Sequence, residues 1–187
     1  MIGEICNSPH IKYMMDFKKE MACDVYVEIG VLYGGSIIEQ MKDPRKCKFI
    51  GIDPFTGYYG NEYDPHRRVN LKEHLEIVKS NIDTNNPHNH SYELIKGFSQ
   101  DVVSDFEKLD LQIDLLFIDG DHSHEGVISD YNNYFKFIKK DKYIIFDNYD
   151  DQNWSGVKSA VDEIIEKDNN IKLIKKIGHC CVVQKQI

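Results

Sequence analysis

Short apolar runs alternate along the chain with longer segments in which apolar residues recur at helical spacing. The short runs predict strands at 24–29, 47–52, 91–95, 113–118, 142–146, 171–175 and 180–184. The longer segments predict helices at about 9–22, 34–42, 70–83, 100–108, 124–138 and 155–168. Runs such as IDLLFI and KYIIF are largely apolar, which is typical of central parallel strands covered on both faces.

Strand–helix alternation at this spacing indicates right-handed βαβ crossovers and a doubly wound α/β sheet. The last two predicted strands are joined by a few residues that include Gly178. This link is too short for a crossover, so these two strands must pair antiparallel. We therefore expect one α/β domain over residues 1–187, in which residues 1–23 form an N-terminal helical segment.

One segment breaks the alternation. Residues 53–70 read DPFTGYYGNEYDPHRRVN and follow the C-terminal end of a predicted strand, the edge at which open α/β sheets bind ligands. A loop of this length is usually functional or disordered, and we predict a substrate or lid loop. Its tyrosines, Tyr58, Tyr59 and Tyr63, either stack on a ring of a bound molecule or only pack the loop down.

Composition restricts the partners. The formal net charge of −8 disfavours nucleic acid and anionic membranes, because the protein's field repels phosphates. The Lys-rich stretches 139–142 and 172–176 are interpreted as solvated ends of elements. The N-terminus lacks a signal-peptide profile, and no apolar run approaches the ~18 residues of a membrane span. These features predict a cytoplasmic protein.

The cysteines point the same way. They are scattered, odd in number, and include no CxxC pair, standing at positions 6, 23, 47, 180 and 181. Neither a disulfide framework nor a zinc knuckle is indicated, so we expect a reducing compartment.

The first predicted strand runs into a glycine-rich turn with the pattern ExGxxxGGS, from Glu28 through Gly30 and Gly34 to Ser36. Glycine lets the backbone turn tightly and approach a ligand closely. The spacing differs from the GxGxxG of dinucleotide-binding proteins, which disfavours an NAD-dependent oxidoreductase. Acidic Glu28 suits a cofactor with a cationic ammonium and sulfonium. The alternative is a structural turn without a ligand.

Asp53 ends the second predicted strand. An acidic side chain at that position can accept both hydroxyls of a ribose. This geometry serves NAD and other nucleoside cofactors alike, so Asp53 supports nucleoside binding without choosing between them.

With VEIGVLYGGS at 27–36, GFSQD at 97–101 and the closing hairpin, the sequence resembles the class I S-adenosylmethionine-dependent methyltransferases. Within them it is similar to the small metal-dependent O-methyltransferases related to catechol O-methyltransferase, and to macrocin-type sugar O-methyltransferases. The resemblance covers residues 24–185. It implies the sheet order 3-2-1-4-5-7-6 with strand 7 antiparallel. It also places Glu28 and Ser36 near the methionine part of the cofactor, and Ser99 and Gln100 near adenine.

Acidic residues follow the fourth and fifth predicted strands, in FIDGDHSHE at 117–125 and FDNYDD at 146–151. Neighbouring parallel strands end at the same rim, so Asp119, Asp121, Asp147 and Asn148 can converge there and suit Mg²⁺. The resemblance implies Asp119, Asp147 and Asn148 as metal ligands, and we also count Asp119 among the cofactor contacts. The alternative role of these residues is helix capping.

His122 is the candidate catalytic base, because a histidine can accept a hydroxyl proton near neutral pH. The catechol enzymes place a lysine three residues after the first metal-binding aspartate, whereas this chain has His122, as in the macrocin-type enzymes. This departure favours a sugar or other aliphatic hydroxyl. His124 is interpreted as an exposed helix-start residue; an HxH zinc site would lack a nearby cysteine. Trp154 is either a pocket wall or part of the core.

Together these features predict Mg²⁺-assisted O-methylation of a small-molecule hydroxyl by an S-adenosylmethionine-dependent enzyme, and the resemblance allows a homodimer. Two alternatives remain open. One is a metal-independent methyltransferase in which the acidic residues only cap helices. The other is a protein that binds S-adenosylmethionine without chemistry.

Overall fold

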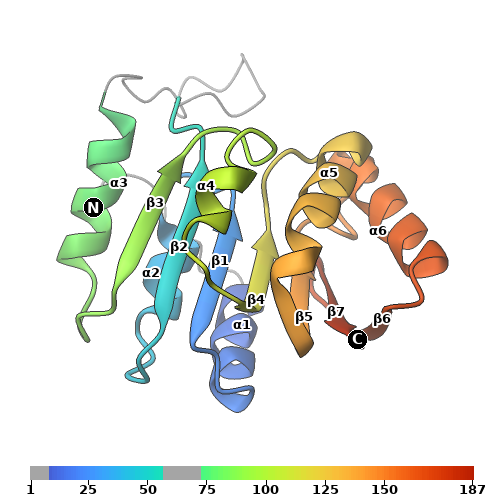
Figure 1. Cartoon of the computed structure of the whole chain (residues 1–187), viewed down its shortest axis with the longest axis horizontal. Coiled ribbons are helices and arrows are strands. Elements are labelled where there is room, and N and C mark those ends of the chain that lie inside the picture. Colours follow the sequence, from blue (N-terminus) through green and yellow to red (C-terminus); the bar gives the residue numbers. More distant parts are fainter. Residues whose placement is uncertain (1–8, 57–72) are drawn as a thin grey trace.

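The computed structural model describes residues 9–56 and 73–187, with side chains from residue 11 onward. A seven-stranded sheet runs through the molecule (Figure 1) in the order β3-β2-β1-β4-β5-β7-β6. Its strands are β1 Val25–Ile29, β2 Lys48–Asp53, β3 Tyr92–Lys96, β4 Ile113–Ile118, β5 Ile138–Phe146, β6 Ile171–Ile177 and β7 Cys180–Lys185. Strand β7 pairs antiparallel with both neighbours, and the other pairings are parallel. The predicted order and the antiparallel hairpin are confirmed.

Helices cover both faces of this sheet. They are α1 Pro9–Glu20, α2 Gly35–Gln40, α3 His74–Thr84, α4 Val103–Glu107, α5 His124–Tyr134 and α6 Ser155–Lys167, with short 3-10 turns η2 Phe135–Phe137 and η3 Gln152–Trp154. The tyrosines Tyr58, Tyr59 and Tyr63 of the predicted lid loop lie outside the described residues.

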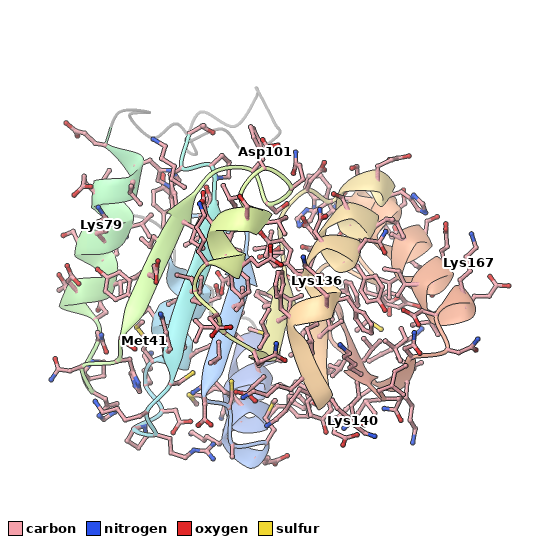
Figure 2. All side chains as sticks on the ribbon, viewed as in Figure 1. Met41, Lys79, Asp101, Lys136, Lys140 and Lys167 are labelled. Atoms are coloured by element: carbon pink, nitrogen blue, oxygen red, sulfur yellow. The ribbon has the colours of Figure 1, made fainter. Side chains whose placement is uncertain are left out.

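The strands bury alternate residues on opposite faces, as their period of two requires. Val27 and Leu116 belong to the cluster that packs against α4, α5 and α6. Tyr26 and Leu115 belong to the cluster on the other face, against α1, α2 and α3. Charged side chains lie on the outer surfaces of the helices (Figure 2), and the described part of the chain contains no helix long and apolar enough to span a membrane.

The start of β5 differs from the prediction. The helix expected over 124–138 ends at Tyr134, and β5 begins at Ile138 instead of residue 142. Ile138 is buried and pairs with Ile113, although polar residues follow it. In the stretch interpreted as solvated, Lys139 and Lys142 place their ammonium groups 2.9 and 3.3 Å from a carboxylate oxygen of buried Asp114. A buried charge therefore recruits these lysines into the strand.

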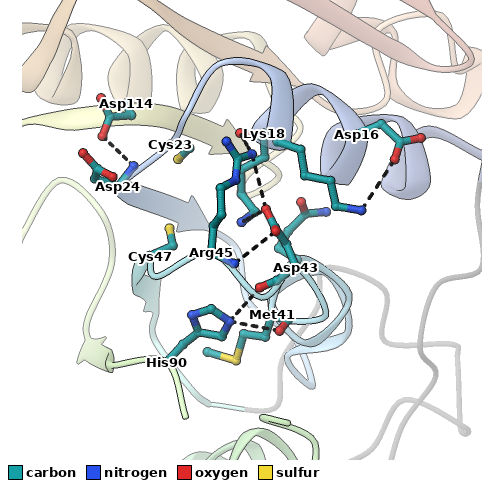
Figure 3. A network of polar contacts seen from close by, with 12 residues as sticks. Asp16, Lys18, Cys23, Asp24, Met41, Asp43, Arg45, Cys47, His90 and Asp114 are labelled. Atoms are coloured by element: carbon teal, nitrogen blue, oxygen red, sulfur yellow. Dashed lines mark hydrogen bonds and ion pairs between the residues drawn. The ribbon is translucent and has the colours of Figure 1, made fainter. Parts of the chain in front are cut away.

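A polar network ties α1 to the N-terminal edge of the sheet (Figure 3). The ammonium of Lys18, only 1% exposed, lies 3.2 Å from the equally buried carboxylate of Asp43. The Asp43 carboxylate also accepts the backbone N–H of Arg45. The Nε2 of buried His90 donates to the carbonyls of Met41 and Asp43, at 3.1 and 2.9 Å. The network fixes the turn between α2 and β2, at the edge of the sheet where the parallel strands begin.

Replacing Lys18 with methionine is expected to lower the free energy of unfolding by roughly 3 kcal/mol, because the substitution leaves the Asp43 charge buried without its ammonium partner. Lys19→Met is the matched control on the same helix, since Lys19 is 40% exposed and 3.9 Å from Asp16. Denaturant unfolding of the two variants measures the difference. Equal losses for the two would show that the buried pair contributes no more than a surface pair.

Candidate active site

The ends of the central parallel strands lie level with one another. The N–H of Asp119 donates to the carbonyl of Ile29 at the end of β1, and the N–H of Asp147 donates to Ile118 at the end of β4, at 2.9 and 3.0 Å. The N–H of Gly30 donates to a carbonyl of β2 at 2.9 Å. These bonds bring the glycine-rich turn and the acidic residues predicted after β4 and β5 to one rim.

Gly30, directly after β1, packs against the main chain of Asp119 and Gly120, directly after β4. A Cβ atom at position 30 would lie 2.0 Å from the carbonyl oxygen of Asp119 and 2.9 Å from the Cα of Gly120, and the φ of Gly30 is +91°. No other residue fits there without moving β4. Gly34 also has a left-handed φ, +83°, but a Cβ there would make only ordinary contacts with α3.

The carboxylate of Asp53 holds the glycine-rich turn from within. Its Oδ2 accepts the N–H groups of Val31 and Leu32, at 2.9 and 3.2 Å, and its Oδ1 accepts the N–H of Phe55 at 2.6 Å. Burial raises the pKa of Asp53 although these donors act against the rise. Contact with a ribose stays a prediction; in the described structure both carboxylate oxygens bind the backbone.

The residues predicted near the methionine part of the cofactor are joined to one another. Glu28 is fully buried and accepts hydrogen bonds from the hydroxyls of Ser36 and Tyr26, the latter at 2.6 Å. Burial raises the pKa of Glu28 to about 8. Glu28 and Ser36 therefore fix the start of α2 relative to β1.

Helix α3 holds the same turn from outside, which the sequence analysis missed. The Nε2 of buried His74 lies 2.9 Å from the carbonyl oxygen of Leu32, and the side-chain amide of Asn81 donates to Tyr33 at 3.1 Å. The signal in the sequence is that His74 and Asn81 share the buried stripe of α3 with Val78. Polar residues within an apolar stripe are expected to have a specific partner.

Three non-glycine residues in the turns that follow the strands have left-handed backbone conformations. They are Leu32, Phe55 and Asn148, with φ of +49°, +47° and +54°. Such conformations cost free energy and persist where surrounding contacts hold them, often at functional sites. Here Asp53 and His74 supply those contacts for the first two.

The segment predicted to contact adenine is held by a carboxylate that the sequence analysis missed. The hydroxyl of Ser99 donates to Asp130 on α5, and the hydroxyl of Tyr134 donates to the Ser99 carbonyl at 2.9 Å. Asp130 is 3% exposed, and burial raises its pKa to about 7. A Cβ on Gly120 would lie 3.2 Å from an Asp130 oxygen, so this carboxyl also supports the turn after β4. The adjacent Gln100 is exposed.

An acid–imidazole pair stands at the centre of the rim. Nε2 of His122 lies 3.1 Å from Oδ1 of Asp119, and the two side chains are 19% and 30% exposed. Burial, together with the charge of Asp147, raises the pKa of Asp119 to about 7, against the hydrogen bond from His122. Burial lowers the pKa of His122, but the hydrogen bond to Asp119 and the surrounding carboxylate charges outweigh it and the net shift is upward. The Asp119 carboxylate therefore favours the protonated form of the His122 imidazole.

The remaining predicted ligands are only partly brought together. Oδ1 of Asp147 accepts the thiol of Cys180 at 3.1 Å, and the Asn148 amide points to Asp151 at 3.5 Å. Asp121 faces away, accepting the N–H and hydroxyl of Ser123 at the start of α5. Within the described ranges no three His, Cys, Asp or Glu side chains are grouped to hold a metal ion.

The histidine two residues after His122 has a different partner. Nε2 of His124 lies 2.9 Å from a carboxylate oxygen of Glu163 on α6. His124 is the first residue of α5, as predicted, but its side chain is half-buried against Glu163 instead of exposed.

The strand order 3-2-1-4-5-7-6 with β7 antiparallel is that of the class I methyltransferase fold. Residues 27–149 match the protein family described as "Methyltransferase domain". The chain belongs to this family.

Three known proteins illustrate the relationship. An uncharacterized protein of Acanthamoeba polyphaga mimivirus is 40% identical over 143 residues, which are 75% of this chain; the chain spans 58% of that protein's length. The O-methyltransferase from Bacillus cereus in complex with SAH shares the fold with a TM-score of 0.71 at 19% identity, over 98% of this chain and 84% of that one. CalS11, a TDP-rhamnose 3'-O-methyltransferase, has a TM-score of 0.65 at 18% identity, over 92% and 77% of the two chains.

Glu28→Gln is expected to gain stability relative to the native protein as the pH rises from about 5 to 8. The native Glu28 carboxyl has a pKa of about 8 in the folded state against 4.5 when exposed. The folded protein therefore binds more protons in this window, and its stability falls by up to about 1.4 kcal/mol per pH unit through this group. Unfolding in urea at several pH values measures the difference, with Glu76→Gln as an exposed control. A difference that does not change with pH would contradict the assignment.

Asp53→Asn is expected to lower the free energy of unfolding by about 1–3 kcal/mol, because an amide cannot accept all three backbone N–H groups. Binding of S-adenosylhomocysteine should weaken in parallel, as the glycine-rich turn loses its inner support. Asp101→Asn, at an exposed position near the same rim, is the control. Calorimetry that finds both variants with native affinity would rule out this role for Asp53.

Proposed function

We propose that the chain transfers a methyl group from S-adenosylmethionine to a hydroxyl of a small molecule, with Mg²⁺ at the acidic rim. The observation that carries the proposal is the Asp119–His122 pair, which lies at the rim where Gly30 packs directly against the main chain of Asp119. This juxtaposition puts a proton acceptor next to the turn that the family uses for its cofactor.

The cofactor assignment is supported by the family and by the close packing of the glycine-rich turn on the residues after β4. We propose that Gly30, Gly34 and Ser36 line the methionine end, with Glu28 fixing them from behind. Asp53 would lie at the ribose, and Ser99, Gln100 and Asp119 complete the contacts. The structural relative from Bacillus cereus, described in complex with SAH, supports a nucleoside cofactor in this fold.

His122 is proposed as the base. With Nε2 donating to Asp119, Nδ1 is the ring nitrogen that can take the proton of the acceptor hydroxyl. Asp119 orients the ring and stabilises the imidazolium that forms. As the proton moves to Nδ1, the acceptor oxygen attacks the sulfonium methyl group in line and S-adenosylhomocysteine leaves. The rim holds the two reactants at a fixed separation, which lowers the entropic part of the barrier.

The donor set after β4 and β5 suits Mg²⁺, because carboxylate and amide oxygens are hard ligands. Asp119, Asp147 and Asn148 would hold the ion, and a bound cation would offset the burial and the repulsion from Asp147 that raise the pKa of Asp119. A bound Mg²⁺ would polarise the acceptor hydroxyl as a Lewis acid.

A metal-independent methyltransferase is the second candidate. It is favoured by the partners that Asp147 and Asn148 already have, the thiol of Cys180 and the carboxylate of Asp151. In this case Asp147 and Asn148 only stabilise the turn after β5.

We propose a sugar or other aliphatic hydroxyl as the acceptor. His122 at this position resembles the macrocin-type sugar enzymes, and CalS11, named for TDP-rhamnose, shares the fold. The formal net charge of −8 favours a small molecule over nucleic acid.

The first test is cofactor binding. Calorimetric titration with S-adenosylhomocysteine, with and without MgCl₂, should show specific binding that NAD does not match. Tighter binding of NAD would overturn the assignment of the cofactor.

The second test is turnover. Formation of S-adenosylhomocysteine should be followed with TDP-rhamnose and with catechol as acceptors. His122→Gln is expected to reduce kcat about 100-fold or more while the affinity for S-adenosylhomocysteine stays within about threefold. His124→Gln, whose partner is Glu163, is the matched control and should keep native turnover.

Three outcomes separate the candidates. Activity that EDTA abolishes and Asp147→Asn reduces supports the Mg²⁺ proposal. Activity that survives both changes replaces it with the metal-independent mechanism. The third outcome is tight binding of S-adenosylhomocysteine, unchanged in His122→Gln, without turnover on any acceptor. It would make the chain a binding protein.

A further inference from the structure

We infer that Trp154 and Gly156, where η3 meets α6, are positioning residues that lock the ring and the main chain of His122. The inference rests on the proposed role of His122 as the base. Trp154 and Gly156 act on His122 from an element that the chain reaches only after β5, so they do not belong to the loop that carries it.

The first contact is between two rings. The centroids of His122 and Trp154 lie 4.7 Å apart with the planes at 66°, an edge-to-face arrangement. Trp154 is only partly buried and packs against the core cluster that contains α5 and α6. One side of the indole therefore meets the core while the ring also contacts the imidazole.

The second contact is between main chains. A Cβ at position 156 would lie 2.7 Å from the carbonyl oxygen of His122 and 2.8 Å from the backbone nitrogen of His124. The start of α6 thus rests directly on the segment 122–124. Any side chain at position 156 would have to move that segment.

The support beneath these contacts is ordered. Oδ1 of Asp151 accepts the N–H of Asn153 at 2.9 Å, and the carbonyl of Asp151 accepts the N–H of Trp154 at 3.0 Å. These bonds fix the backbone of η3, from which the indole extends. Helices α5 and α6 lie side by side (Figure 1), and the segment 122–124, which leads into α5, packs against the start of α6.

A base needs this restraint because one hydrogen bond does not fix an imidazole. The Nε2 contact to Asp119 leaves the ring free to rotate about that bond, and the terminal torsion of histidine is broad. Contact with the indole restricts that rotation, and the Gly156 contact fixes the backbone from which the side chain extends. Nδ1, the nitrogen proposed to take the proton, then points in one direction.

This arrangement predicts more than the two earlier interpretations of Trp154. A wall of the acceptor pocket would act on acceptor binding and so on KM. A core residue would act on stability alone. A positioning residue acts on kcat and on the conformation of His122, with cofactor binding unchanged.

The first test measures tryptophan fluorescence and needs no acceptor. Trp154 is the only tryptophan in the sequence, so the emission reports on this residue alone. A protonated imidazole in contact with an indole quenches its emission, so the emission is recorded at pH 6. His122→Gln should therefore raise the emission by twofold or more, whereas His124→Gln should leave it unchanged. Gly156→Ala should raise it toward the His122→Gln level, and Ser155→Ala, at the exposed neighbouring position, should not.

The second measurement follows His122 itself. The ring-proton NMR signals of His122, assigned by their loss in His122→Gln, should be shifted by the indole ring current in the native protein. Trp154→Ala should move them toward the values of an exposed histidine. Trp154→Phe, which restores an aromatic edge, should keep part of the shift. Comparison of folded spectra excludes loss of structure as the cause.

The kinetic measurement uses whichever acceptor shows turnover. Trp154→Ala and Gly156→Ala should lower kcat by tenfold or more with KM for S-adenosylmethionine within threefold, and Trp154→Phe should recover most of the loss. Ser155→Ala should keep native kcat.

Two results would overturn the inference: His122 signals that are the same in the native protein and in Trp154→Ala, or a rise in acceptor KM with kcat unchanged. Failure of the proposed function looks different. If His122→Gln keeps full turnover, or no acceptor reacts, His122 is not the base, whatever the fluorescence and NMR show of its contact with Trp154.

Discussion

The close approach of two main chains at Gly30 is the constraint on which the site depends. With only 2.0 Å between the Asp119 carbonyl oxygen and the place where a Cβ would stand, β1 and β4 end against each other without any side chain between them. The glycine-rich turn must then pass directly over the start of the loop after β4, which carries Asp119 and His122. The glycine-rich turn and the Asp119–His122 pair are neighbours because of this one steric contact.

Around that contact the chain buries several carboxyl groups, and each costs free energy that its donors offset only in part. Burial raises the pKa of Glu28, Asp53, Asp119 and Asp130 alike. The hydrogen-bond donors are hydroxyl groups for Glu28 and Asp130. They are backbone N–H groups for Asp53 and an imidazole for Asp119. An apolar rim would be more stable, so the arrangement is one that function explains better than stability.

The topology could be predicted from the sequence because it depends on local features, the apolar runs and the short link at Gly178. The details that were wrong or missing depend on distant partners. Lys139 and Lys142 look solvated until Asp114 is placed beside them, and β5 accordingly begins earlier than its apolar run. His74 and Asp130 are ordinary helix residues in the sequence, and only tertiary packing sets them beside Leu32 and Ser99. Whether the predicted ligands bind a cofactor or metal is likewise not a property of spacing alone.

The grip of α3 on the glycine-rich turn has a thermodynamic consequence. His74 and Asn81 bind the carbonyls of Leu32 and Tyr33, so the turn has its observed shape only while α3 is docked. Any ligand that requires this shape is then coupled to the docking equilibrium of the helix, and the coupling is reciprocal. A molecule or protein that bound the outer surface of α3 and favoured the docked helix would raise the affinity of the turn for its ligand. The ligand of the turn would raise the affinity of α3 for that molecule by the same factor. The helix is thus a place from which affinity at the rim can be tuned without touching the rim.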